Sequence, residues 1–425
     1  MKISWFKKAV SPEIGDLIAG YGFEDHAETK RDDLFVVGLC CDDGENKLLI
    51  VSCDLVGLDS PFIQKVRGLC AGILGIEESR VLLSCTHNHS GPMCKEFASH
   101  PGLIDRRYLD RLEQAILEGT KELAGKFQEA EVYFYSSKVD ANRNRRYVTA
   151  DNCASFGPCR RETIPVSTEF ADKEFGSVIF CRPGTHRPIY VIGNYAAHPL
   201  AGHAPGLGGL RISADFPGAF RRYVTAETGA ECMYISGAAG DMVPTEDELG
   251  SDAVERMGIR LGKEMLGAVA DATRNPGRFL MKDAKTGGLI RKLSVPLRAV
   301  QKKYPGKSEI TIEVQCVSIG DIAFVGLPDE PCAELGQEIK WHSPFRRTFI
   351  AYCATGFTAY ICPANFLVAG GYEAIQHIIR ARHVIDLIKC AVDTLFDLRE
   401  NVWPSEGEPY PDNLNLPLVN IPKNN

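Results

Sequence analysis

Apolar residues along this chain switch repeatedly between the spacing of β-strands and the spacing of helices. Two β-rich runs, Leu34–Cys41 and Lys47–Cys53, flank the turn sequence Asp42-Asp43-Gly44 and predict a β-hairpin. Ser60-Pro61 predicts the start of a helix that runs to about Leu74, with Ser60 as the N-cap and proline at the first helical position. The apolar run Val81–Cys85 predicts the next strand.

The same alternation continues to about residue 399. Helical spacing of apolar residues predicts helices near residues 108–123, 217–228, 252–272 and 374–399. The apolar face of the last helix would contain Ile378, Ile385, Ile388, Val392 and Leu395. Short β-rich runs predict further strands at Val132–Tyr135, Val178–Cys181, Ile189–Ile192, Cys232–Ile235, Leu289–Val300, Ile310–Ser318 and Ile322–Gly326.

Hairpins and isolated strands interleaved with helices predict an α/β architecture with mixed β-sheets and flanking helices. No Pro/Ser-rich linker, low-complexity tract or internal repeat marks a domain boundary. We therefore expect a single large catalytic domain over residues 1–402. The polar, proline-rich residues 403–425 would form a C-terminal surface tail.

Composition limits which binding partners and which cellular compartment we expect for this protein. The formal net charge of −7 and the pI near 5.9 argue against nucleic-acid binding, which needs a basic surface. The sequence contains no signal-peptide core and no apolar stretch of about 18 residues, so we expect no stable membrane anchor. The 15 cysteines are an odd number without any Cys-x-x-Cys pair, which favours buried free thiols in a cytoplasmic protein.

Candidate chemistry begins with Thr86-His87-Asn88-His89-Ser90-Gly91-Pro92, directly after the predicted strand Val81–Cys85. Residues two apart on an extended segment point to the same side, so His87 and His89 can face one ion, or one ion and its substrate. Such a pair alone is more often found on a surface than around a metal.

Polar residues also follow other predicted strands. His198 alone would be a structural histidine, and Glu330 alone a carboxylate that opens a helix. Strand carboxyl ends are where open α/β sheets bind ligands, so we expect one convergent pocket. With His87, these two residues supply the two imidazoles and one carboxylate of a catalytic zinc site that keeps a position open for water.

The sequence resembles the neutral/alkaline ceramidase family across most of residues 18–375. The resemblance rests on motifs that occur in family order: Ala19-Gly20-Tyr21-Gly22, Thr86–Pro92, Asn142-Arg143, Asn194–Pro199, Ile212–Gly218, Gly240-Asp241, Leu327–Glu330, Tyr360 and Tyr372-Glu373. It implies a catalytic α/β domain that binds one Zn²⁺ ion and hydrolyses the amide of ceramide.

Carried over by position, the resemblance implies the zinc ligands His87, His198, Glu330 and Tyr360. His89 would face the substrate or carry a proton. Arg143 would contact the substrate, although the nearby Arg145 is an alternative, and Tyr372 would lie near the reacting carbonyl. Bound zinc brings the pKa of water to about 7 and polarises a carbonyl oxygen, which suits attack on an amide.

Three aspartates are candidates for supporting roles. Asp215 and Asp241 are expected to accept hydrogen bonds that orient the histidine ligands. Asp54 follows the run Leu48–Cys53 and is a third candidate for such a supporting role. A structural role for Asp54 in a turn or helix cap is favoured at least as much.

The sequence departs from the family at Gly240-Asp241-Met242-Val243-Pro244-Thr245, where Val243 replaces a serine tied to ceramide hydrolysis. The resemblance also covers the catalytic domain alone, without the family's immunoglobulin-like domain or secretory signal. We therefore expect a small-molecule or N-acyl substrate other than ceramide. Two alternatives stay open: a zinc hydrolase of esters, and a non-catalytic metal-binding relative that acts as a sensor or partner.

Other hydrolase and nucleotide-binding motifs are weak. The chain has no Gly-x-Ser-x-Gly sequence, so serine-hydrolase chemistry is disfavoured. Gly206-Leu207-Gly208-Gly209 does not follow a predicted strand and is expected to be a flexible loop beside the pocket. The sequence does not indicate an oligomeric state.

Overall fold

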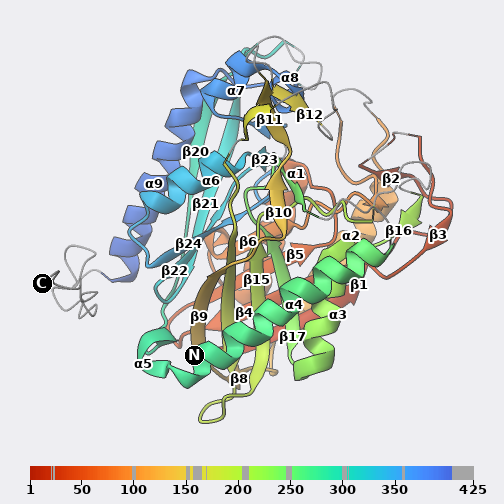
Figure 1. The fold of residues 1–425 in the computed structure, drawn as a ribbon. Helices are drawn as coiled ribbons and strands as arrows, with labels where there is room; N and C mark the ends of the chain where they lie inside the picture. Colours follow the sequence, from red (N-terminus) through yellow and green to blue (C-terminus); the bar gives the residue numbers. More distant parts are fainter. Residues whose placement is uncertain are drawn as a thin grey trace, which may run out of the picture.

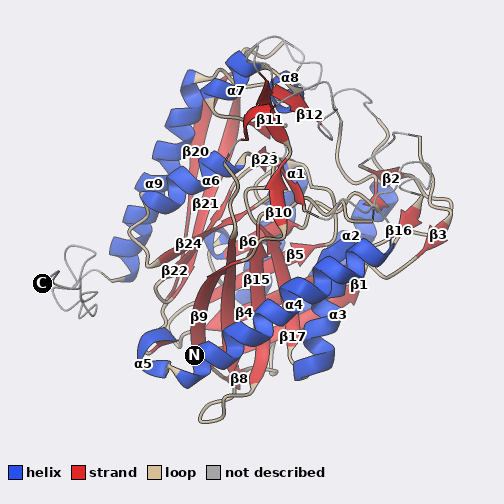
Figure 2. Ribbon diagram, viewed as in Figure 1, coloured by secondary structure: helices blue, strands red, loops and turns tan. Residues whose placement is uncertain are grey.

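The computed structural model describes residues 1–20, 22, 24–97, 102–149, 154–156, 165–168, 170–202, 210–245, 251–298, 304, 306–356 and 359–403. Three large sheets carry most of the strands (Figures 1 and 2). The predicted loop Gly206–Gly209 and the predicted tail beyond Trp403 lie outside the described residues.

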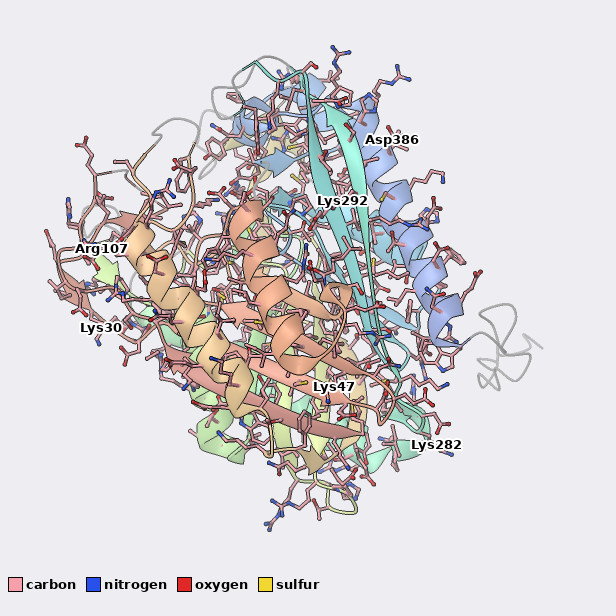
Figure 3. The ribbon with its side chains drawn as sticks, turned by 180° about the vertical axis from the view of Figure 1, so that it is seen from behind. Lys30, Lys47, Arg107, Lys282, Lys292 and Asp386 are labelled. Atoms are coloured by element: carbon pink, nitrogen blue, oxygen red, sulfur yellow. The ribbon has the colours of Figure 1, made fainter. Side chains whose placement is uncertain are left out.

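The first sheet has the strand order β6-β5-β4-β1-β8. Helices α1 and α2 pack side by side on its outer face, as Figure 3 shows from behind. The predicted hairpin is confirmed as the antiparallel pair β4–β5, and β6 then pairs with β5 in parallel. The bounds are β1 Lys2–Ala9, β4 Phe35–Asp42, β5 Lys47–Cys53, β6 Val81–Cys85, β8 Gln128–Glu129, α1 Ser60–Leu74 and α2 Arg106–Glu122.

The second sheet has the order β17-β15-β14-β9-β19, and its outer face is covered by α3 and α4 (Figure 2). Its parallel pair is β15–β17. The bounds are β9 Glu131–Lys138, β14 Glu174–Cys181, β15 Pro188–Tyr195, β17 Glu231–Ser236, β19 Leu280–Met281, α3 Asp215–Thr228, α4 Ser251–Arg274 and α5 Pro276–Phe279.

The third sheet has the order β20-β21-β22-β24, with α6 and α9 on its outer face. Its parallel pair is β22–β24. The bounds are β20 Thr286–Pro296, β21 Glu309–Ile319, β22 Ile322–Gly326, β24 Arg347–Ala351, α6 Ala333–Trp341 and α9 Arg382–Val402.

Short elements connect these layers. They are β2 Ile18–Ala19, β3 Thr29–Lys30, β7 Gly91–Pro92, β10 Asn142–Asn144, β11 Arg146–Thr149, β12 Ala154–Phe156, β13 Pro165–Thr168, β16 Arg211–Ile212, β18 Met242–Pro244, β23 Glu330–Pro331, β25 Tyr360–Ile361, α7 Ala364–Ala369, α8 Tyr372–Gln376 and the 3₁₀ turn Glu78–Arg80.

The inner faces of the three sheets share one apolar core. Each strand alternates between this core and the core beneath its own helices, because successive side chains point to opposite faces of a sheet. The shared core includes Leu39 and Ile50 from the first sheet, Phe134 and Ile192 from the second, and Phe324 and Phe349 from the third. The predicted mixed α/β fold, compact and with flanking helices, is thus confirmed.

Two helix starts differ from the prediction. The N-cap of α1 is Asp59 rather than Ser60, and the Asp59 carboxylate accepts from the backbone of Glu96 instead of capping the helix. The predicted helix over 374–399 is interrupted after α8, because residues 378–380 leave helical geometry to pair with the end of β20.

The face of α9 that packs on the third sheet also differs. It is formed by Val384, Leu387, Ala391, Leu395 and Leu398, whereas Ile385 is 69% exposed. The break before Arg382 shifts the helical phase, so a pattern counted from residue 374 gives Leu395 correctly but selects Ile385 in place of its neighbour Val384. No helix among the described residues is long and apolar enough to cross a membrane.

Candidate metal centre

The carboxyl ends of three parallel strand pairs, one from each large sheet, meet at one place. The Ser236 hydroxyl, at the end of β17, donates to the Thr86 carbonyl after β6 at 2.7 Å. The backbone N–H of Tyr352, after β24, donates to the Ser236 carbonyl at 3.0 Å. These bonds tie the three sheets together, and β10 and β23 lie close by, above β15 in Figure 1.

His87 and His198 face each other across this junction. Their ring centroids are 4.7 Å apart, and both side chains are buried. The Nδ1 atom of His87 contacts the Val56 carbonyl at 2.7 Å, and that of His198 contacts the Ala239 carbonyl at 2.6 Å. Because a carbonyl only accepts, each Nδ1 carries the proton that binds it, and each Nε2 is left facing the junction.

Glu330, at the start of β23, places its carboxylate between the two imidazoles. Its Oε2 atom lies 3.3 Å from His87 Nε2 and 3.2 Å from His198 Nε2. The Tyr352 hydroxyl donates to the same oxygen at 3.1 Å. The predicted convergence of the two histidines and the carboxylate is therefore what the structure shows.

His89 completes the cluster. Its ring centroid lies 4.7 Å from that of His87 and 5.6 Å from that of His198. Its Nδ1 contacts the Gly20 carbonyl at 2.9 Å. Gly20 has φ +123°, and a Cβ there would lie 2.6 Å from the Cβ of His89, so only glycine lets this segment approach.

The protonation states suit a cation. Burial lowers the pKa of His198 to about 4 and that of His89 well below its usual range, so both are neutral near pH 7. Burial acts to raise the pKa of Glu330, but the adjacent His87 and His198 outweigh it and hold that pKa well below the usual range. Neutral imidazoles and an ionised carboxylate are the forms that bind metals.

The donor spacing also fits a tetrahedral ion. Two ligands bonded at 2.0–2.1 Å to a tetrahedral metal lie about 3.3 Å apart, close to the separations of Glu330 Oε2 from the two imidazoles. A second donor set is His87, His89 and His198, whose ligand atoms all lie within 4.8 Å of one another. The residues present therefore fit a metal ion in either arrangement.

Tyr360 lies beside Glu330 because β25 pairs with β23 in parallel register. The Arg145 guanidinium donates to the Tyr360 hydroxyl at 3.0 Å and to Glu373 at 2.6 Å. Burial, and then the charge of Glu330, raise the pKa of Tyr360 well above its usual range, so a phenolate would need a bound cation. Tyr372 packs on Tyr360 with ring centroids 5.5 Å apart and is 42% exposed.

Arg143 lies on β10, directly opposite Val243 on β18, and both side chains are half-buried. The structure thus places Val243, the position that departs from the family pattern, next to Arg143, a position that matches it. Arg145, rather than Arg143, contacts a candidate ligand. Contact of Arg143 with the substrate, with Arg145 as the alternative, stays a prediction.

Strained backbone surrounds the cluster. Every described non-glycine residue with positive φ adjoins it: His87 itself, Asp329 before Glu330, Cys353 after Tyr352, Ala359 before Tyr360, and Asp215, which binds the backbone after His198. Left-handed conformations of such residues cost about 1–2 kcal/mol each and persist where the fold enforces them, often at functional sites.

The aspartates do not orient the histidines. Asp215 accepts from the backbone of Ala201 and Gly202, and Asp241 accepts from Asn144 and from the first turn of α6. The predicted role of both is wrong, because backbone carbonyls hold the Nδ1 atoms of His87, His89 and His198 instead. Burial raises the pKa of each aspartate to about 6.

Asp54 has a structural role, as the partner in an ion pair rather than as a turn or cap residue. It forms a buried two-pronged pair with Arg221 and also accepts from the Phe35 N–H.

Comparison with known proteins agrees with this architecture. No family model and no curated protein matches the sequence. The solved structure of the neutral ceramidase from Pseudomonas aeruginosa superposes with a TM-score of 0.78 at 14% identity, over 94% of this chain and 75% of that chain. The chain has the ceramidase fold.

A solved structure described as a ceramidase complexed with C2 gives a similar result, with a TM-score of 0.77 at 13% identity over the same shares of the two chains. At this identity the likeness shows the ceramidase fold alone. The fold expected from the resemblance is thereby confirmed.

Within the ceramidase fold, sequence reasoning missed Tyr352 as a partner of Glu330. Its only signal was its position near the end of the run Phe349–Cys353, and its hydroxyl reaches Glu330 because β24 lies parallel to β22. The reasoning also missed the buried contact of Lys95 with Asp329, whose charged atoms lie 3.8 Å apart beside Glu330.

Proposed function

We propose that this protein is a zinc-dependent hydrolase that cleaves an amide bond in an N-acyl substrate. The convergence of His87 Nε2, His198 Nε2 and Glu330 Oε2 from three sheets is the observation that carries the proposal. The fold supports it, since both solved structures compared above are described as ceramidases.

His87, His198, Glu330 and Tyr360 would hold the ion. A zinc ion bound there would supply a water of lowered pKa and polarise the scissile carbonyl. The carbonyls of Val56 and Ala239 keep both imidazoles in the tautomer that presents Nε2. The Arg145 guanidinium favours the ionised form of Tyr360, because its positive charge lies against that hydroxyl.

His89 is assigned the proton transfer. It is neutral, its Nδ1–H is fixed by Gly20, and its Nε2 belongs to the same donor cluster. A neutral imidazole there can take a proton from the attacking water and return it to the departing amine nitrogen. Tyr372, on the exposed side, would hydrogen-bond the reacting carbonyl oxygen, and Arg143 would contact the acyl substrate.

The test compares matched N-acyl amide and ester substrates with and without a chelator. We expect amide hydrolysis that the chelator abolishes and added zinc restores. His89→Gln should retain bound metal but lose about 100-fold or more in turnover, whereas loss of metal in this variant would make His89 a ligand. Faster ester than amide cleavage would favour the ester hydrolase, and bound metal without turnover would favour the non-catalytic sensor.

Val243 tests substrate choice separately. The valine cannot donate a hydrogen bond, and it lies opposite Arg143 at the site's edge. We expect Val243→Ser to raise ceramide hydrolysis relative to that of other N-acyl amides. No change in that ratio would remove Val243 as the determinant.

A further inference from the structure

One end of the molecule exposes bulky apolar side chains next to the candidate site. It is built by α7, α8 and the first turns of α9, which lie together at the top of Figure 1. Val368 is 83% exposed, Ile375 75% and Ile385 69%. Side chains of this size cost free energy in water, and their concentration on one end of a protein indicates a contact surface.

The same end is basic, although the chain as a whole carries a net charge of −7. Arg298, Arg380 and Arg382 are exposed, and none of the three pairs with a carboxylate among the described residues. The Arg298 guanidinium donates to the Ala374 carbonyl, which fixes it beside α8. The acidic residues between 364 and 386 are Glu373, which is buried against Arg145 and Arg146, and Asp386, which pairs with His383.

This surface is continuous with the candidate site through α8. The helix turns Tyr372 toward Tyr360 and Glu373 toward Arg145, while Ile375 points to solvent. Arg146 donates both to Glu373 and to the Gly370 carbonyl between α7 and α8. A partner bound on Val368 and Ile375 would therefore lie next to the site.

We propose that this apolar and basic end, defined by Val368, Ile375, Ile385, Arg298, Arg380 and Arg382, docks on an anionic lipid surface. Aliphatic side chains on short protruding helices can enter the headgroup boundary, and flanking arginines attract anionic headgroups. The choice of a lipid rests in part on the proposed function, since an N-acyl chain held in a lipid layer would be presented directly to Tyr372.

The test is sedimentation of the full chain with vesicles of phosphatidylcholine, alone or mixed with phosphatidylserine. We expect binding to the mixed vesicles that weakens with added salt. Val368→Ser combined with Ile375→Ser should lower vesicle affinity about tenfold or more. Arg380→Gln combined with Arg382→Gln should remove the preference for phosphatidylserine.

Matched controls lie elsewhere on the surface. Ile14 is 56% exposed, and Arg182 and Arg187 are exposed arginines, so Ile14→Ser and the Arg182→Gln, Arg187→Gln pair should leave vesicle binding unchanged. Absence of vesicle binding, or equal binding by the Val368 and Ile375 variant, would overturn the proposal. A dimer in solution that this variant dissociates would also overturn it, in favour of a second copy as the occupant.

Vesicle binding needs no turnover, so it separates this inference from the proposed function. If the protein is a hydrolase, the Val368 and Ile375 variant should cleave a short-chain substrate in free solution at the wild-type rate. It should cleave a long-chain substrate held in vesicles more slowly.

Discussion

Two buried groups of ionisable side chains lie at the ends of neighbouring strands and differ in one respect. Asp54 follows β5, and its carboxylate is fully engaged by Arg221 and the Phe35 N–H. His87 follows β6, and its cluster has one carboxylate facing the Nε2 atoms of two imidazoles. The first group has its charges and hydrogen bonds matched within the protein, whereas the second has spare donor capacity for a cation.

The two groups show two uses of buried ionisable side chains: one stabilises the fold, and the other can bind a ligand. A paired charge is held in place because removing one partner strands the other in a medium of low dielectric. The second cluster is held by strained backbone and turns the Nε2 atoms of two histidines and a carboxylate toward one point, an arrangement that suits a bound cation.

The largest effect is expected for His198→Ala. Removing one ligand should abolish metal binding and lower amide hydrolysis by roughly a thousandfold or more, since metal assistance is worth several kcal/mol. The free energy of unfolding of the metal-free protein should change far less than the turnover does. His342→Ala, on an exposed histidine, is the control. Full activity in His198→Ala would move the site elsewhere.

Arg221→Met should instead act mainly on the stability of the fold. It leaves Asp54 buried without its partner and should lower the free energy of unfolding by about 3–5 kcal/mol, measured by urea denaturation. The neighbouring Arg222 pairs with Asp32 and Glu255 nearer the surface, so Arg222→Met should cost about 1 kcal/mol or less. Equal costs for the two variants would contradict the structural role of the Asp54 pair.

Burial of neutral histidines predicts a pH dependence of stability. Burial lowers the pKa of His377 to about 4, so below about pH 6.5 the unfolded chain binds a proton that the folded protein does not. Relative to His377→Gln, the metal-free wild type should lose up to about 3 kcal/mol as pH falls from 6.5 to 4. The difference between the two proteins isolates this effect, because Asp215 and Asp241, with pKa values of about 6, act with the opposite sign.

The pH series is measured by urea denaturation, with His342→Gln as the surface control. Parallel stability curves for the wild type and His377→Gln would show that His377 is not held neutral.

Tyr352→Phe is the smallest expected change. It removes one hydrogen bond to Glu330 and should weaken metal affinity roughly tenfold without loss of the fold. Tyr190→Phe is a matched control, because the buried Tyr190 hydroxyl has no hydrogen-bond partner among the described residues. Unchanged zinc affinity in a competition titration of Tyr352→Phe would show that this bond does not support the site.

Local patterns predicted the elements that depend on nearby residues. The hairpin β4–β5, the body of α1 and the strand β6 follow from apolar spacing and turn residues. The meeting of His87, His198 and Glu330 followed from strand ends together with the family resemblance, and the structure reproduces it.

Features that depend on distant contacts were not predicted. The end of β20 pairs with residues 378–380, so α9 begins later than predicted. The carbonyls of Val56 and Ala239, rather than aspartates, contact the Nδ1 atoms of the histidines. Tyr352 reaches Glu330 because β22 and β24 pair in parallel. In each case the partner is a backbone group or a strand register, which side-chain identities do not reveal.

Elemental analysis of the purified full chain after zinc reconstitution tests the central claim most directly. The wild type and His342→Ala should hold about one zinc ion per chain, and His87→Ala and His198→Ala should hold none. A wild-type protein that takes up no metal, or variants that all retain it equally, would contradict the assignment of these histidines as a metal centre.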